Sequence, residues 1–138
     1  MKLNPNCIFV DTNVLNGFYL NRTPDVECLK YLYSLKGKKL FISSLTIGQM
    51  VAFFQKKLTN EKIKDLVRYI FTKFTVVDFT EQDIQKALLL EYSDMEDNFQ
   101  YVLGIKMKCF YFITNDKQFS AFRNIKVLKP SEIRSIKK

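Results

Sequence analysis

The residues of this chain that are best placed to do chemistry are carboxylates, and several stand where a buried charge would be costly. The apolar run 8–10 leads directly into Asp11, and the run CFYFI at 109–113 is followed by TND, which ends in Asp116. The segment EYSDMED adds Glu91, Asp94, Glu96 and Asp97. A carboxylate at the end of a buried strand must cap a helix, pair with a cation or hold a metal.

Three of these acids can meet if the strands and the helix after residue 94 end at one edge of a sheet. Asp11, Asp97 and Asp116 would then converge, and clustered carboxylates without a cation repel and raise one another's pKa values. Mg²⁺ or Mn²⁺ resolves this because these ions take oxygen ligands. Such an ion activates water and stabilises charge on a phosphate, so the pattern predicts metal-assisted phosphodiester chemistry.

Each acid also has a plainer interpretation. Asp11 and Asp94 can cap helices, where anions are favoured. Glu91 and Glu96 can be solvated surface charges, and Asp116 can cap a turn within DKQFSAF. These alternatives are weaker together than singly, because three acids fall at matching ends of the predicted elements.

The elements that must position these acids alternate between strands and helices. Apolar runs predict strands at 7–10, 40–42, 74–79, 109–114 and 125–128. Helical spacing and capping residues predict helices starting near 13, 23, 44, 59 and 80, and a long helix over 95–107. Continuously apolar strands alternating with helices indicate a parallel sheet covered on both faces. We therefore expect one domain over 1–138, a three-layer α/β/α sandwich with a mainly parallel sheet of about five strands.

Composition excludes several kinds of catalysis and favours a polyanionic partner. The chain has 138 residues, a net charge of +8 and no histidine. Ser-His-Asp triads, Cys-His pairs and histidine-ligated zinc are therefore excluded. Neither GxxxxGK[ST] nor GxGxxG occurs, so a nucleotide-binding loop is unsupported. The positive charge attracts nucleic acid, although lysine-rich solubility explains it equally well.

The expected location is the cytoplasm. Cys7, Cys28 and Cys109 are widely spaced and lack a CxxC pair, which is typical of free thiols in a reducing compartment. The apolar runs are too short to span a bilayer. The start MKLNPNCIFVD is unlike a signal peptide, because its apolar run is short and ends in Asp11.

Three stretches together resemble the PIN-domain family. They are FVDTNVL at the first predicted strand, SSLTIGQM after the second, and DMEDNFQYVLGIKMKCFYFITNDKQF near the end. The similarity runs from about residue 7 to 130 and has the same order of elements. Members of this family are mostly small metal-dependent ribonucleases, and many are VapC-type toxins of bacterial toxin–antitoxin pairs.

The resemblance implies roles for particular residues. Asp11, Asp97 and Asp116 would be the catalytic ligands of Mg²⁺ or Mn²⁺, with Asp94 as a further candidate ligand. Four other residues would contact the substrate or support the ligands: Asn13, Gln49, Thr114 and Asn115. The resemblance implies RNA and a cognate antitoxin as partners. A second copy of the chain is a further candidate partner, and the short apolar runs leave no role for a membrane.

Two positions depart from the family pattern. Gln49 stands where the helix after the second strand usually brings a glutamate, and a carboxamide carries no charge and cannot act as a general base. Asn115 stands where a basic residue is common. The alternative to a nuclease is therefore a catalytically weak or inactive module that binds RNA or protein.

A phosphoacceptor receiver domain is a further alternative, since it is also an α/β fold with acids at strand ends. Asp11, Asp78, Thr114 and Lys129-Pro130 favour it. Against it, the first strand lacks a paired acid. The stretch of about thirty residues between the third and fourth strands is also too long for one crossover helix.

Two surface features have more than one interpretation. The apolar run Met50, Val51, Phe53 and Phe54 is typical of core, and any exposed part would form an interface with a second copy or an inhibitory helix. Seven lysines can flank an RNA path or simply form polar faces: Lys36, Lys38, Lys39, Lys56, Lys57, Lys106 and Lys108.

Overall fold

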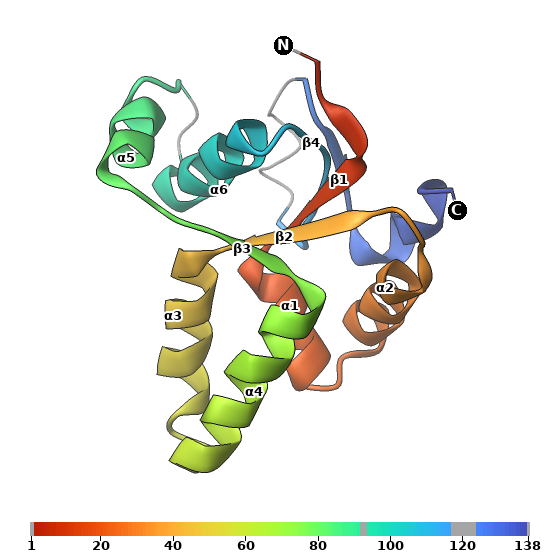
Figure 1. Ribbon diagram of the computed structural model, residues 1–138, viewed down its shortest axis with the longest axis vertical. Helices are drawn as coiled ribbons and strands as arrows, with labels where there is room; N and C mark the ends of the chain where they lie inside the picture. The colour runs from red at the N-terminus through yellow and green to blue at the C-terminus, as the bar shows by residue number, and fades with distance from the viewer. Residues whose placement is uncertain (1, 92–93, 117–123, 138) are drawn as a thin grey trace.

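The computed structural model describes residues 2–91, 94–116 and 124–137, and it contains one five-stranded parallel sheet. The strand order is β3-β2-β1-β4-β5, and each neighbouring pair is parallel (Figure 1). The strands are β1 (Asn4–Val10), β2 (Lys39–Ser43), β3 (Thr75–Val77), β4 (Cys109–Ile113) and β5 (Lys126–Leu128). The predicted α/β class and parallel sheet are confirmed.

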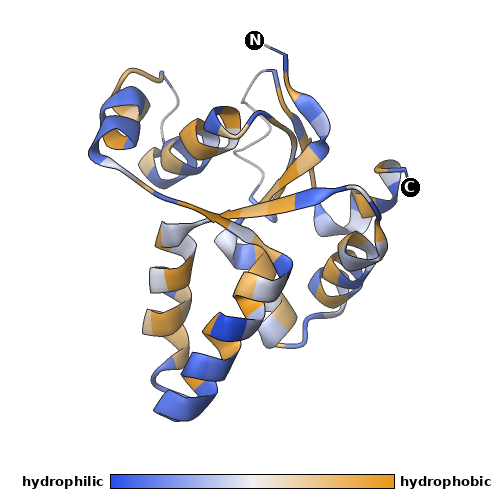
Figure 2. Ribbon diagram, in the orientation of Figure 1, coloured by the Kyte–Doolittle hydropathy of each residue, from blue (hydrophilic) through white to orange (hydrophobic). Residues whose placement is uncertain are grey.

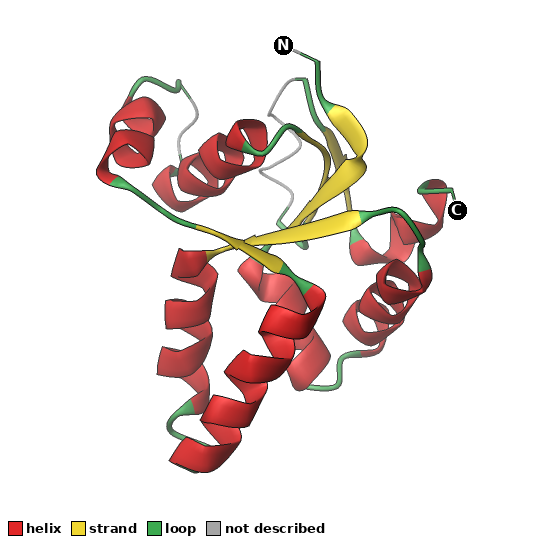
Figure 3. Cartoon of the chain, viewed as in Figure 1, coloured by secondary structure: helices red, strands yellow, loops and turns green. Residues whose placement is uncertain are grey.

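Helices connect the strands, as Figure 3 shows in red. They are α1 (Thr12–Tyr19), α2 (Thr23–Ser34), α3 (Ser44–Phe54), α4 (Asn60–Lys73), α5 (Glu81–Leu88) and α6 (Met95–Lys106), followed by the 3₁₀ helix η2 (Pro130–Ser135). The predicted elements are confirmed in type and order, with β1 starting earlier than predicted and β3 shorter than predicted. The sequence did not predict η2. The DKQFSAF turn lies mostly within 117–123, outside the described residues.

The sheet separates two apolar cores, because successive side chains of a strand point to opposite faces. Ile8 and Val10 of β1 face the larger core, which α1–α4 and η2 cover. Cys7 and Phe9 face the smaller core under α6, and α5 packs against α6. Figure 2 shows the strands largely in orange between these helical layers.

Two sequence expectations concern the cysteines and the membrane. All three cysteines are buried free thiols, as predicted. Across the residues described here, every helix falls short of the length and apolar character that a membrane span requires.

The path of the chain brings distant acids to one edge of the sheet. From β1 the chain builds β2 and β3 on one side, and β4 and β5 later occupy the other, so the strand order switches between β1 and β4. Ligands of open parallel sheets bind at such switch points, outside the carboxyl ends of the strands. Val10 pairs with Ile113, so Asp11 and Thr114 lie side by side just beyond the sheet.

The position of α6 follows from its short connection to β4. Only Met107 and Lys108 join the two elements, and Lys108 has a left-handed φ of 58°. α6 therefore runs back against β4, and its first turn lies at the carboxyl end of that strand. The helix sits close to the sheet, since a Cβ on Gly104 would overlap the Phe112 ring.

Candidate metal centre and adjoining cleft

Asp11 both caps α1 and faces the site. Its Oδ1 accepts a hydrogen bond from the Thr12 amide at 2.7 Å. Its Oδ2 accepts from the Thr114 hydroxyl at 2.8 Å and from Asn13 Nδ2 at 3.1 Å. Burial raises the pKa of Asp11 to about 6, although the hydrogen bonds from Thr114 and Thr12 oppose the rise. The capping and site interpretations of Asp11 are therefore compatible.

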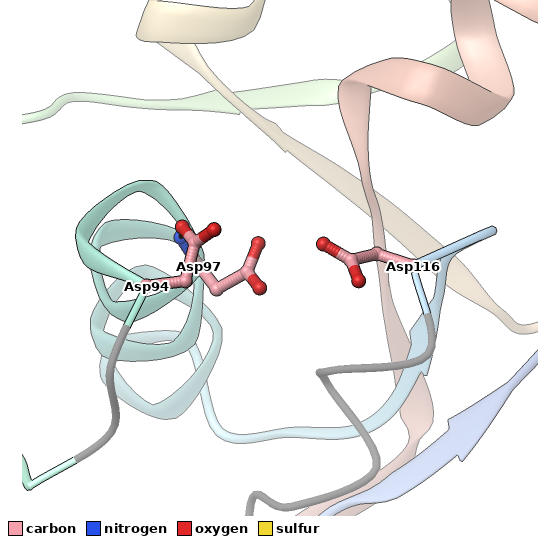
Figure 4. Close-up of side chains that lie close together, drawn as sticks. All are labelled: Asp94, Asp97 and Asp116. Atoms are coloured by element: carbon pink, nitrogen blue, oxygen red, sulfur yellow. Dashed lines mark hydrogen bonds between the residues drawn. The ribbon is translucent and has the colours of Figure 1, made fainter.

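Three carboxylates gather where α6 begins and β4 ends. One oxygen from each of Asp94, Asp97 and Asp116 lies within 4.8 Å of the others. In Figure 4, Asp94 and Asp97 project from the start of α6, and the Asp97 carboxylate faces that of Asp116. Asp94 also caps the helix, because its Oδ1 accepts from the Asp97 amide at 3.0 Å. This group is the part of the site that most resembles a cation-binding centre.

Asp97 is the most perturbed of these acids. Only 7% of its surface is exposed, and its Oδ2 is a buried acceptor that meets no hydrogen-bond donor in the part of the chain described. Burial, followed by the neighbouring charges of Asp116 and Asp94, raises its pKa to about 8. A buried oxygen without a donor, next to other carboxylates, fits a hard cation better than it fits an isolated charge.

The geometry differs in one respect from the predicted trio of Asp11, Asp97 and Asp116. All three line one cleft, but Asp94 rather than Asp11 completes the tight group. Glu96 is exposed and also lines the cleft, whereas Glu91 is an exposed side chain away from it. The sequence predicted which elements carry the acids, and only the structure shows which carboxylates come closest.

Polar side chains behind Asp11 connect it to α2. The Asn115 amide donates to Asn13 Oδ1 at 3.1 Å, and Asn115 Nδ2 donates to Asp25 Oδ1 at 3.0 Å. Asp25 is buried against α1, where a Cβ on Gly17 would overlap its carboxylate. Asp25 was not predicted as a site residue, because its contact with Asn115 joins segments 90 positions apart.

Carboxamides also line the cleft, which has a volume of about 390 Å³. Gln49 Oε1 accepts from the Thr12 hydroxyl at 2.9 Å, and that hydroxyl lies 2.7 Å from the Thr46 hydroxyl. Asn16 and Gln100 line the same cleft as Gln49, together with the apolar side chains of Leu45 and Phe53. Asn16 and Gln100 were not predicted from the sequence. Helical spacing could have found them, because each follows a candidate residue, Asn13 or Asp97, by three positions.

The apolar run at 50–54 is mostly core. Met50 and Phe54 are buried, whereas Phe53 keeps 39% of its surface exposed at the cleft. The Lys57 ammonium lies 4.7 Å from the centre of the Phe53 ring.

Three of the seven candidate lysines lie away from the acids. Lys38 and Lys39 precede or begin β2, at the opposite edge of the sheet, and Lys38 donates to Asn6. Lys106 is bound to Asp83 and to the carbonyl of Asp78. These three side chains therefore do not flank the cleft as a continuous basic path.

The chain belongs to the PIN domain family, whose pattern matches residues 8–125. A relative named Ribonuclease VapC1, from Aquifex aeolicus (strain VF5), is 28% identical to this chain in an alignment 141 residues long. The alignment covers 94% of this chain and 94% of the relative. The strand order 3-2-1-4-5 also differs from the 2-1-3-4-5 order of receiver domains, so the receiver alternative is wrong.

Solved structures share the fold. One is a toxin–antitoxin complex from Klebsiella pneumoniae, 18% identical, with a TM-score of 0.70 over 91% of this chain and 99% of that chain. Another is VapC20 of Mycobacterium tuberculosis, described as a toxin that cleaves the sarcin-ricin loop. It is 16% identical, with a TM-score of 0.65 over 86% of this chain and 98% of that chain.

Proposed function

We propose that this protein is a divalent-metal-dependent endoribonuclease and the toxin of a toxin–antitoxin pair. The observation that carries the proposal is the Asp97 carboxylate, which lies beside those of Asp94 and Asp116 and whose buried Oδ2 has no donor among the described residues. Membership of the PIN domain family and the relative named Ribonuclease VapC1 support RNA as the substrate.

The acids have separate tasks in this proposal. Asp97 and Asp116 would hold Mg²⁺ or Mn²⁺ between α6 and β4, and Asp94 and Asp11 would complete the negative surroundings. A bound ion of this kind supplies a Lewis acid and an activated water for phosphodiester hydrolysis. Thr114 and Asn13 fix the orientation of the Asp11 carboxylate through their hydrogen bonds to Oδ2.

The second candidate function is a module on the same fold that binds RNA or protein without turnover. Gln49 favours it, because its carboxamide carries no charge and its oxygen already accepts from the Thr12 hydroxyl. Calorimetric titration with Mn²⁺ separates the two functions, since a nuclease requires binding below millimolar metal. Gln49→Glu should then strengthen metal binding and create or increase cleavage.

The proposed partners are an antitoxin and a second copy of the chain. The Klebsiella pneumoniae structure is a toxin–antitoxin complex, and we infer that this chain likewise has a cognate antitoxin. A second copy of the chain is a further candidate partner, with Phe53 among its exposed apolar side chains. We expect the protein to meet RNA and the antitoxin in the cytoplasm.

The decisive experiment compares RNA cleavage by the wild type and by the double variant Asp11→Asn/Asp97→Asn in Mn²⁺. The wild type should cut RNA and lose this activity in EDTA, whereas the double variant should be inactive. Asp65→Asn is a matched control, because Asp65 is exposed on α4, where it pairs with Arg68. Equal cleavage by the wild type and the double variant would indicate a contaminating nuclease and refute the proposal.

A further inference from the structure

We propose that the carboxamide side of the cleft is a subsite for one nucleobase of single-stranded RNA, next to the acids. The subsite consists of Asn16, Gln49 and Gln100, with Phe53 and Leu45 as its apolar wall. This inference rests on the proposed function and names the part of the substrate that selects the cleavage position.

The main support for the subsite comes from Gln100. It lies one helical turn beyond Asp97 on α6, lines the same cleft, and keeps only 5% of its surface exposed. Its Oε1 accepts no hydrogen bond from any residue that the structure describes. The same holds, over the described ranges, for Asn16 Oδ1 of α1, whose residue lines the same cleft. Leaving a buried acceptor without a donor is unfavourable, so two residues that line one cleft and carry such acceptors favour a ligand that donates to them once their carboxamides turn towards it.

The chemistry of this side selects a neutral, planar and polar ligand. A carboxamide offers a donor and an acceptor without a charge, which matches the edge of a nucleobase. Another anion would be repelled by Asp11, Asp97 and Asp116, which line the adjoining part of the cleft. A base in this position would leave its phosphate on the side of the acids.

Size and apolar contacts agree with a base. A cleft of about 390 Å³ is within the range of pockets that take small organic groups. Phe53 and Leu45 provide apolar contact for a base, and recognition of single-stranded RNA commonly combines stacking on aromatic side chains with hydrogen bonds to base edges. Lys57, beside the Phe53 ring, adds a positive charge near the RNA backbone.

The test measures base preference without requiring hydrolysis. Fluorescent single-stranded hexamers of A, C, G and U are titrated in Ca²⁺, and binding is followed by anisotropy after the RNA is shown to be intact. The wild type should prefer one base by about tenfold or more, and Gln100→Met should reduce this preference to about threefold or less. Gln85→Met is the matched control, because Gln85 is exposed on α5, and it should keep the full preference.

The outcomes separate this inference from the proposed function. Equal binding of the four hexamers by the wild type, or an unchanged preference in Gln100→Met, would overturn the subsite. A base preference without any RNA cleavage in Mn²⁺ would support the subsite and refute the hydrolysis. Thermal unfolding verifies that Gln100→Met is folded, and if it is not, Gln49→Met takes its place with the same expected loss of preference.

Discussion

The starts of α5 and α6 have similar sequences and opposite electrostatics. TEQD and DMED each place a capping residue three positions before an aspartate that becomes buried, Asp83 in α5 and Asp97 in α6. Asp83 Oδ2 accepts from the Thr80 amide and hydroxyl, each at 2.9 Å, and from Lys106 Nζ at 3.0 Å. Asp97 instead faces carboxylates, and its Oδ2 lacks a donor within the described chain.

The pKa values of the two aspartates move in opposite directions. Burial raises the pKa of Asp83, but the hydrogen bonds from Thr80 and Lys106 outweigh it, and the net pKa is lowered. Burial and the neighbouring acids raise the pKa of Asp97 to about 8. The local motif therefore specifies a helix start in both places. What the helix start faces decides whether its acid is a stabilising group or a candidate metal ligand.

The largest expected difference is in RNA cleavage. Asp97→Asn should lower the Mn²⁺-dependent rate by on the order of 10² or more, because it removes a charge that holds the ion at the reacting phosphate. Asp83→Asn should keep most of the activity, since Asp83 points to Lys106 and not into the cleft. Initial rates on one RNA substrate measure both effects. Equal losses in the two variants would remove the functional distinction between the two helix starts.

Metal binding should stabilise the folded protein through the acids at the start of α6 and not through Asp83 at the start of α5. A ligand that binds the folded state at 100 times its Kd adds about 2.7 kcal/mol to the free energy of unfolding. We expect this gain from Mn²⁺ in the wild type and in Asp83→Asn, and its loss in Asp97→Asn. Urea unfolding with Mn²⁺ and with EDTA measures it, and full stabilisation of Asp97→Asn would argue against Asp97 as a ligand.

The pH dependence of stability should have opposite signs at the two sites in metal-free protein. Folded Asp97 holds its proton more tightly than the same residue does in the unfolded chain. Its contribution to the free energy of unfolding is therefore complete below pH 3.8 and is lost as the pH rises towards about 8. Asp83 contributes to the free energy of unfolding when the pH is above its unfolded pKa of 3.8. This contribution is lost as the pH falls through the lowered pKa of Asp83 in the folded protein.

The measurement is the free energy of unfolding in EDTA from pH 4 to pH 8. Asp97→Asn removes the titrating group, so its stability should rise relative to that of the wild type as the pH increases. Parallel curves for the two proteins would contradict the raised pKa of Asp97.

The contrast between α5 and α6 also shows what the sequence could predict. Strands, helices and caps are local features, so the apolar run of β1 and the capping of α5 by Thr80 were readable, and acids at strand ends could be placed at one edge. The contact of Lys106 with Asp83 could not be predicted from the sequence, because it joins residues 23 positions apart whose packing depends on the whole helical layer. The polar lining was missed for a related reason, since Gln100 matters through an unmet hydrogen bond and not through its residue type.

The smallest expected effect concerns the ion pair that satisfies Asp83. Lys106→Met should lower the free energy of unfolding by about 1 kcal/mol or less, because the lysine side chain is 35% exposed and the buried Asp83 carboxylate keeps both hydrogen bonds from Thr80. Methionine also keeps an unbranched side chain of similar length. Lys64→Met is the matched control, since Lys64 pairs with Glu61 at 3.5 Å while 59% exposed, and it should change stability still less. The loss in Lys106→Met should grow as the pH rises above 3.8, where the unpaired Asp83 is charged, and urea unfolding at pH 4 and pH 8 measures this. Both variants could instead lose the same small amount of unfolding free energy at both pH values. The Thr80 hydrogen bonds alone would then account for the charged state of Asp83. The difference between the two helix starts would in that case lie in their caps and not in Lys106.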